Sequence, residues 1–121
     1  MSTLLTRTSD DNVIVYFTDA RIIDESRIES LAQEMGALIT DTEIKKLILN
    51  FQNVGFMSSA MLGKLISFGK KCKTGNISLR LCGINENIGQ VFKLMKLDKV
   101  FKIDKDEASA LKNIGKKGFF G

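Results

Sequence analysis

The chain has 121 residues, of which 44% are hydrophobic and 26% are charged, a balance typical of a globular protein rather than a disordered or membrane-embedded one. It contains no histidine, which excludes Ser-His-Asp and Cys-His catalytic arrangements and histidine-containing metal sites. The net charge is +4, but aromatic residues make up only 7% of the chain, so we expect a solvated basic face and no direct DNA binding. We expect one domain over residues 1–121, with no metal and no cofactor.

The amino-terminal residues and the two cysteines bear on where the protein works. Residues 1–8 lack the apolar segment of a signal peptide, and no apolar run approaches the roughly 20 residues that span a bilayer. Cys72 and Cys82 both lie in apolar segments and predict buried thiols in a reducing compartment. We therefore expect a cytoplasmic protein without a membrane span.

Two strands and a helix are predicted at the start of the chain. A weak strand near Leu4 and Leu5 and a stronger β-branched one over residues 13–17 flank a polar turn, as in a hairpin. Ser26 and Glu29 have the spacing of a capping box for the helix that follows. The apolar positions of that helix recur every three or four residues: Ile28, Leu31, Ala32, Met35, Leu38 and Ile39.

The middle of the chain predicts a buried strand followed by an amphipathic helix. Residues 47–51 form a short, nearly continuous apolar run, as expected for a strand covered on both faces. The helix follows Ser58 and Ser59 and ends in lysines, which suit a helix carboxyl end. Its apolar stripe comprises Leu62, Leu65, Ile66, Phe68 and Cys72.

Three further elements and a tail are predicted after residue 76. Alternating apolar residues over 77–82 indicate a half-buried strand, and Asn85 can cap a short helix that reaches Met95. A strand over residues 100–103 precedes a last helix, which we expect to begin at Asp104 and Glu107. Residues 115–121 are expected to form a frayed tail in which Phe119 and Phe120 are available for docking.

Alternation of strands and helices predicts an α/β fold with a mixed, mostly parallel central sheet of about five strands and four helices packed on it. Function in such sheets tends to lie at the carboxyl ends of the strands. Ser58 and Ser59 stand at such an end, where a strand gives way to a helix. Backbone N–H groups at a helix start carry partial positive charge, so a hydroxyl there can cap the helix or carry a phosphate.

The junction Phe56-Met57-Ser58-Ser59-Ala60-Met61-Leu62-Gly63 resembles the signature Asp-Ser-Ser-Gly-Leu of STAS domains, the family of bacterial anti-sigma factor antagonists. Residues 24–31 resemble the start of the family's first helix, and residues 97–103 resemble its final strand. The resemblance implies a single STAS-like domain that binds proteins and is not an enzyme. In the family's scheme, the unmodified antagonist binds an anti-sigma factor that is also a serine kinase, and phosphorylation of one serine breaks that complex.

Aligning Leu62 with the leucine of the signature places Ser58 at the aspartate, Ser59 at the first serine and Ala60 at the second. We interpret the second serine as the usual phosphoserine, and Ala60 has no hydroxyl to phosphorylate. Either Ser59 accepts the phosphate instead, or the protein binds its partner constitutively. Ser59 and Ser58 are therefore the phosphorylation candidates, and an unmodified helix cap is the alternative for each.

The resemblance also implies a partner-binding surface at the junction, formed by Ser58, Ser59, Ala60, Met61, Leu62 and Lys64. We expect Met61, Lys64 and Ser67 on the helix face opposite the apolar stripe, where they are candidate partner contacts, with plain surface as the alternative. Two further functions remain open. One is a non-phosphorylatable scaffold subunit of a larger signalling assembly, which would form homo-oligomers. The other is an enzyme with a lysine-activated serine, which is disfavoured because no lysine stands at a spacing that demands such pairing.

Overall fold

The computed structural model describes residues 4–114. The expectations for the tail, with Phe119 and Phe120, lie outside these residues. A short 3-10 turn lies at Leu97–Lys99. The helices and strands follow in the order β1 Leu4–Ser9, β2 Asn12–Phe17, β3 Arg21–Ile22, α1 Glu25–Leu38, β4 Lys46–Asn50, β5 Phe56–Met57, α2 Ser59–Thr74, β6 Ser78–Cys82, α3 Glu86–Leu94, β7 Lys102–Asp104 and α4 Glu107–Ile114.

The central sheet has five strands in the order β1-β2-β4-β6-β7. β1 and β2 form the predicted antiparallel hairpin, and β2, β4, β6 and β7 run parallel to one another. Crossover helices separate the parallel strands along the chain, as parallel pairing requires. The predicted α/β fold with a mixed, mostly parallel sheet and four helices is confirmed.

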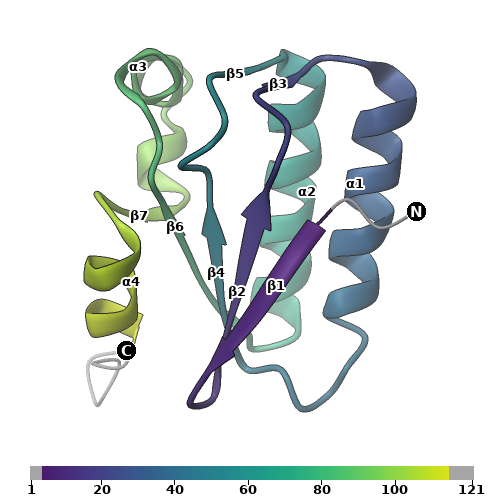
Figure 1. The fold of residues 1–121 in the computed structure, drawn as a ribbon, viewed down its shortest axis with the longest axis vertical. Helices are drawn as coiled ribbons and strands as arrows, with labels where there is room; N and C mark the ends of the chain where they lie inside the picture. The colour runs from purple at the N-terminus through teal and green to yellow at the C-terminus, as the bar shows by residue number, and fades with distance from the viewer. Residues whose placement is uncertain (1–3, 115–121) are drawn as a thin grey trace.

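The helices cover both faces of the sheet, with α1 and α2 on one side and α4 on the other (Figure 1). Side chains alternate along each strand, so Leu49 enters the larger core beneath α1 and α2 while its neighbour Ile48 enters the smaller core beneath α4. Cys72 belongs to the larger core and Cys82 to the smaller one. Both thiols are free and buried, as predicted, and burial raises their pKa values to about 11 and about 12.

The cap of α1 differs from the predicted capping box. Asp24 is the N-cap, and its carboxylate accepts a hydrogen bond from the backbone N–H of Arg27 at 3.0 Å. The Ser26 hydroxyl donates to the same carboxylate at 2.7 Å, and Glu29 pairs with Lys64 instead of turning back to the helix start. A carboxylate is favoured over a hydroxyl here because its charge interacts with the positive end of the helix.

The last strand begins at Lys102, two residues later than expected. Phe101 is buried against Phe92, with ring centroids 6.2 Å apart, and against Gly69, where an added Cβ would lie only 2.8 Å from the Phe101 ring. This packing directs the chain away from the sheet until residue 102.

The last helix begins at Glu107, and Asp106 caps it by accepting the Ser109 N–H at 2.9 Å. Asp104, expected at that start, is buried and pairs with Arg80 at 2.6 Å.

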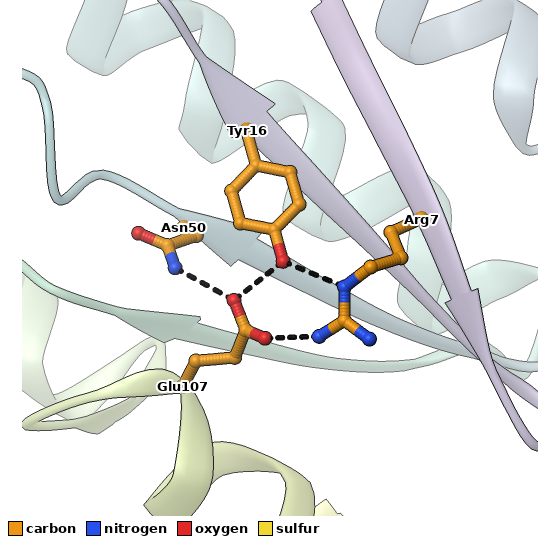
Figure 2. A network of polar contacts seen from close by, with 4 residues as sticks. All are labelled: Arg7, Tyr16, Asn50 and Glu107. Carbon is orange, nitrogen blue, oxygen red and sulfur yellow. Dashed lines mark hydrogen bonds and ion pairs between the residues drawn. The ribbon is translucent and has the colours of Figure 1, made fainter.

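A polar network fixes the start of α4 to three strands (Figure 2). Glu107 accepts hydrogen bonds from the Tyr16 hydroxyl at 2.6 Å and from the Asn50 amide at 3.0 Å, and it forms an ion pair with Arg7. Arg7 also donates from Nε to the Tyr16 hydroxyl at 3.1 Å. Because these partners lie on β1, β2 and β4, one carboxylate anchors α4 across three strands.

Candidate functional site

Two very short strands that the sequence did not reveal hold the junction before α2. β3 and β5 pair in parallel as a separate two-stranded sheet, with Ile22 opposite Met57. The Ser58 N–H donates to the Ile22 carbonyl at 3.0 Å, which extends this pairing to the helix start. α1 follows β3 and α2 follows β5, so the two helices begin next to each other at one edge of the molecule (Figure 1).

The two serines of the junction have different environments. Ser58 is half-buried and is the N-cap of α2, where its hydroxyl oxygen accepts the Met61 N–H at 3.4 Å. Ser59 is the first residue of the helix and is exposed, as is Ala60. The first turn of α2, all of which the structure describes, carries no acidic side chain. The positive end of this helix therefore meets no charge from its own first turn.

Met61 and Leu62 lie in the core, and the expectation that Met61 faces outward is wrong. Their side chains are 0% and 3% exposed. Met61 precedes Leu65 by four residues and Phe68 by seven, so it continues the buried stripe of α2 toward the junction. In their present positions these two side chains support the junction from beneath and do not offer a contact surface.

Lys64 and Ser67 lie on the side of α2 that faces α1. Lys64 is half-buried and pairs with Glu29 of α1 at 3.1 Å, and Ser67 is exposed. Both residues line a shallow depression of about 230 Å³ between the two helices. The predicted outward position is therefore confirmed for Ser67, whereas Lys64 connects α2 to its neighbouring helix.

Exposed apolar side chains that the sequence did not single out flank the junction. Phe56 of β5 is 45% exposed, and Ile23, directly after β3, is 43% exposed. The guanidinium of Arg21 lies 5.3 Å from the centroid of the Phe56 ring, in reach of a cation–π interaction. We refer to Ile23, Phe56, Ser59, Ala60 and Lys64 as the junction surface.

Hydrogen bonds from neighbouring segments hold the loop that leads into β5. Asn85, the N-cap of α3, donates from its amide to the Gly55 carbonyl at 3.1 Å. The Gly55 N–H in turn donates to the Ala20 carbonyl at 2.7 Å. The loop before the junction is thus held from both sides, which presents Phe56 in a defined position.

Two acidic residues that precede α1, Asp19 and Asp24, are engaged by the first turn of that helix. A side-chain hydrogen bond from Arg27 is the main cause that lowers the pKa of Asp19. The Ser26 hydroxyl, followed by the Arg27 backbone N–H, lowers the pKa of Asp24. The two neighbouring helix starts differ in charge. Asp24 and Glu25 stand at the start of α1, whereas the first turn of α2 carries no acidic side chain.

Residues 4–114 hold no group of three or more His, Cys, Asp or Glu side chains that could bind a metal ion. Over the same range, no helix has the length and apolar character needed to cross a bilayer. The chemistry that the junction offers is thus a hydroxyl at a helix start, an ion pair between helices and exposed apolar side chains.

Comparison with known proteins places this geometry in a family. A family model described as the STAS domain matches residues 4–110. An anti-sigma factor antagonist from Mycobacterium paratuberculosis is similar in structure, with a TM-score of 0.82 at 22% identity over 93% of this chain and 93% of that one. An anti-sigma factor antagonist domain protein from Planctomyces limnophilus has a TM-score of 0.80 at 17% identity, covering 93% and 97% of the two chains.

A third similar structure is the phosphorylated form of the Bacillus cell fate determinant SpoIIAA. Its TM-score is 0.69 at 15% identity, with 92% of this chain and 98% of that chain covered. At such identities the structural likeness shows a common fold, while the family model spans most of the sequence. On that match and this fold, the chain belongs to the STAS domain family.

Proposed function

We propose that this chain is an anti-sigma factor antagonist that binds an anti-sigma factor with serine kinase activity over the junction surface, and so regulates sigma-dependent transcription in the cytoplasm. The observation that carries the proposal is the exposed Ser59 at the start of α2, flanked by the exposed Phe56 and Ile23. Large apolar side chains around a small polar centre suit protein binding, because a few such anchors supply most of the affinity of an interface. Two of the similar structures are described as anti-sigma factor antagonists.

Phosphorylation of Ser59 is the proposed switch. A phosphate adds about −1.5 to −2 charges and would stand at a helix start whose first turn carries no acidic side chain. The helix favours that charge, whereas a partner packed over Phe56 and Ile23 would have to bury it. One of the similar structures is a phosphorylated protein, SpoIIAA. Ser58 is the weaker acceptor because its hydroxyl oxygen already caps the helix.

Affinity for the partner tests the switch. The anti-sigma factor kinase is recovered by co-purification from the native host, and its binding to Ser59→Asp, Ser59→Ala and Thr42→Asp is measured by calorimetry. Ser59→Asp is expected to bind about tenfold more weakly than the wild type, and the other two variants within about twofold of it. Thr42→Asp is the matched control, because it adds the same charge at an exposed position beyond the end of α1, away from the helix starts at the junction.

Two results would contradict the proposal. Equal affinity of Ser59→Asp and Ser59→Ala would remove the switch and leave constitutive binding. Recovery of no kinase-like protein under any growth condition would remove the antagonist role. Intact mass measurement on protein from the native host shows directly whether a phosphate is present.

The proposed role requires no catalysis on this chain. A lysine-activated serine would need a lysine free to take the proton of the hydroxyl, and Lys64, on the junction surface, is paired with Glu29. Hydrolytic turnover that disappears in Ser59→Ala while partner binding persists would overturn this part of the proposal.

A scaffold subunit of a larger assembly is the second candidate. The observation that favours it is the outer face of α3, where Val91, Leu94 and Met95 are 41%, 80% and 47% exposed. Spacings of three and four place them on one side of the helix, as in a contact between subunits. Light scattering over a range of concentrations tests this function. An oligomer that Leu94→Gln converts to a monomer supports it, and a strict monomer contradicts it.

A further inference from the structure

A second surface with the features of a binding site lies at the opposite end of α2 from the junction. It is an open groove of about 790 Å³. Its walls are the carboxyl-terminal half of α2, the start of β6, the segment that leads into β7 and the end of α4. The sixteen residues of α2 span about 24 Å at 1.5 Å per residue, so the groove and Ser59 are well separated.

The groove is basic. Its lining includes Lys70, Lys73, Lys99, Lys102 and Arg80, and none of the described residues that line it is acidic. Arg80 is neutralised by Asp104, which lies behind it and is only 8% exposed. The four lysines form no ion pair within residues 4–114, so their charge is available to a ligand.

The groove also offers apolar contacts and an open strand edge. Val100 is 61% exposed, and Ile77 and Leu79 contribute further apolar lining. Pairing between β6 and β7 begins only at Arg80 opposite Lys102. Within the described chain, the first two residues of β6, Ser78 and Leu79, therefore have no strand beside them on the groove side. The Ser78 N–H donates to the Lys45 carbonyl on the β4 side at 2.8 Å, so of these two residues only Leu79 can offer main-chain groups to an extended peptide in the groove.

We propose that this groove binds an extended acidic segment of another protein, one that alternates carboxylate side chains with apolar ones. The lysines would pair with the carboxylates, the apolar side chains would cover Val100 and Leu79, and the backbone would lie along the open start of β6. The charge of the groove selects this occupant over the chain's own last seven residues, which include Lys116 and Lys117 and no acidic side chain. Since the groove is remote from the junction surface, this binding is independent of the proposed function.

Fluorescence anisotropy with a labelled peptide that alternates valine with glutamate tests the proposal. A second peptide, which alternates valine with lysine, is expected not to bind. Lys70→Gln combined with Lys102→Gln should weaken binding of the acidic peptide by about tenfold, because two ion pairs are lost. The matched control combines Lys45→Gln with Lys93→Gln, two exposed lysines outside the groove, and should stay within about twofold of the wild type.

Nuclear magnetic resonance locates the peptide. Backbone amide shifts are expected at Gly69, Ser78 and Val100 and not at Ser59, and circular dichroism checks that each variant is folded. The proposal is overturned if the acidic peptide fails to bind at about millimolar concentration, if both peptides bind equally, or if both lysine pairs matter equally. It is also overturned if binding appears only after residues 115–121 are removed, which would identify the chain's own end as the occupant.

Discussion

The position of Met61 determines whether its side chain contacts a partner at the junction or packs beneath the start of α2. In the signature that the junction resembles, glycine stands at this position, whereas here a fully buried methionine fills the space beneath the start of α2. Its side chain lies with Leu65 and Phe68 in the larger core. Because protein interiors are closely packed, a change in the volume of this side chain would disturb the packing of the whole start of α2.

Met61→Ala is expected to lower the free energy of unfolding by about 2–4 kcal/mol, because it removes buried methylene groups and leaves a cavity. Urea denaturation followed by circular dichroism measures the change. Ser67→Ala, on an exposed position of the same helix, should change it by less than about 0.5 kcal/mol. Equal stability of the two variants would mean that Met61 does not support the junction.

The residues of the site differ in how far the sequence could reveal them. The burial of Met61 was readable, since its distance of four and seven residues from Leu65 and Phe68 is the helical repeat. The exposure of Phe56 and Ile23 was not readable, because it depends on the pairing of β3 with β5, which are far apart along the chain. The sequence position of Ser58 predicted either a helix cap or a phosphate acceptor, and the structure shows the cap.

At the scale of elements, one carboxylate, that of Glu107, carries the polar attachment of the start of α4 to β1, β2 and β4. Burial alone would raise the pKa of Glu107, but hydrogen bonds from Tyr16, Asn50 and Arg7 outweigh it and lower the pKa below the ordinary value of 4.5. A carboxyl group whose pKa is lower in the folded state stabilises the fold while it is ionised. This contribution is complete above its unfolded pKa and is lost as the pH falls through the folded value.

Glu107→Gln should therefore destabilise the protein by about 0.5–1 kcal/mol at neutral pH. The difference from the wild type should begin to shrink as the pH falls below 4.5, the ordinary value, and should continue to shrink until the folded carboxyl, whose pKa is lower, is also protonated. Chemical denaturation at a series of pH values provides the measurement. Glu43→Gln, in the exposed loop before β4, is the control and should have little effect at neutral pH. A difference that stays constant down to pH 3 or so would show that Glu107 acts without its charge.

Elements with a long periodic pattern were predictable, and elements set by tertiary contacts were not. α1 and α2 follow from the three-and-four spacing of their apolar residues, and β2 and β4 from their β-branched and aliphatic runs. β3 and β5 have two residues each, too few to show any alternation. The start of β7 was misplaced because Phe101, an ordinary strand residue by composition, packs on Phe92 and Gly69 instead.

At the scale of the whole molecule, the two cores share the same strands. Val15 and Leu49 face α1 and α2, while Ile14 and Ile48, one position earlier on β2 and β4, face α4. If β2 or β4 unfolds, both cores lose the strand side chains against which their helices pack. The protein is therefore expected to unfold in a single cooperative step.

Tyr16 allows this cooperativity to be measured. It is the only tyrosine, the chain has no tryptophan, and it packs on the smaller core beside α4. Urea transitions followed by tyrosine fluorescence and by far-ultraviolet circular dichroism should have the same midpoint. An earlier fluorescence transition would show that α4 leaves the sheet before the rest unfolds.

The junction surface and the basic groove lie at the two ends of one continuous helix, α2. Each residue of an α-helix advances the direction of its side chains by about 100°. Inserting or deleting one residue between Lys64 and Gly69 would rotate one end against the other and turn buried positions outward. Orthologues of this protein should accordingly vary in loop length, as between α1 and β4, while the number of residues in α2 stays constant.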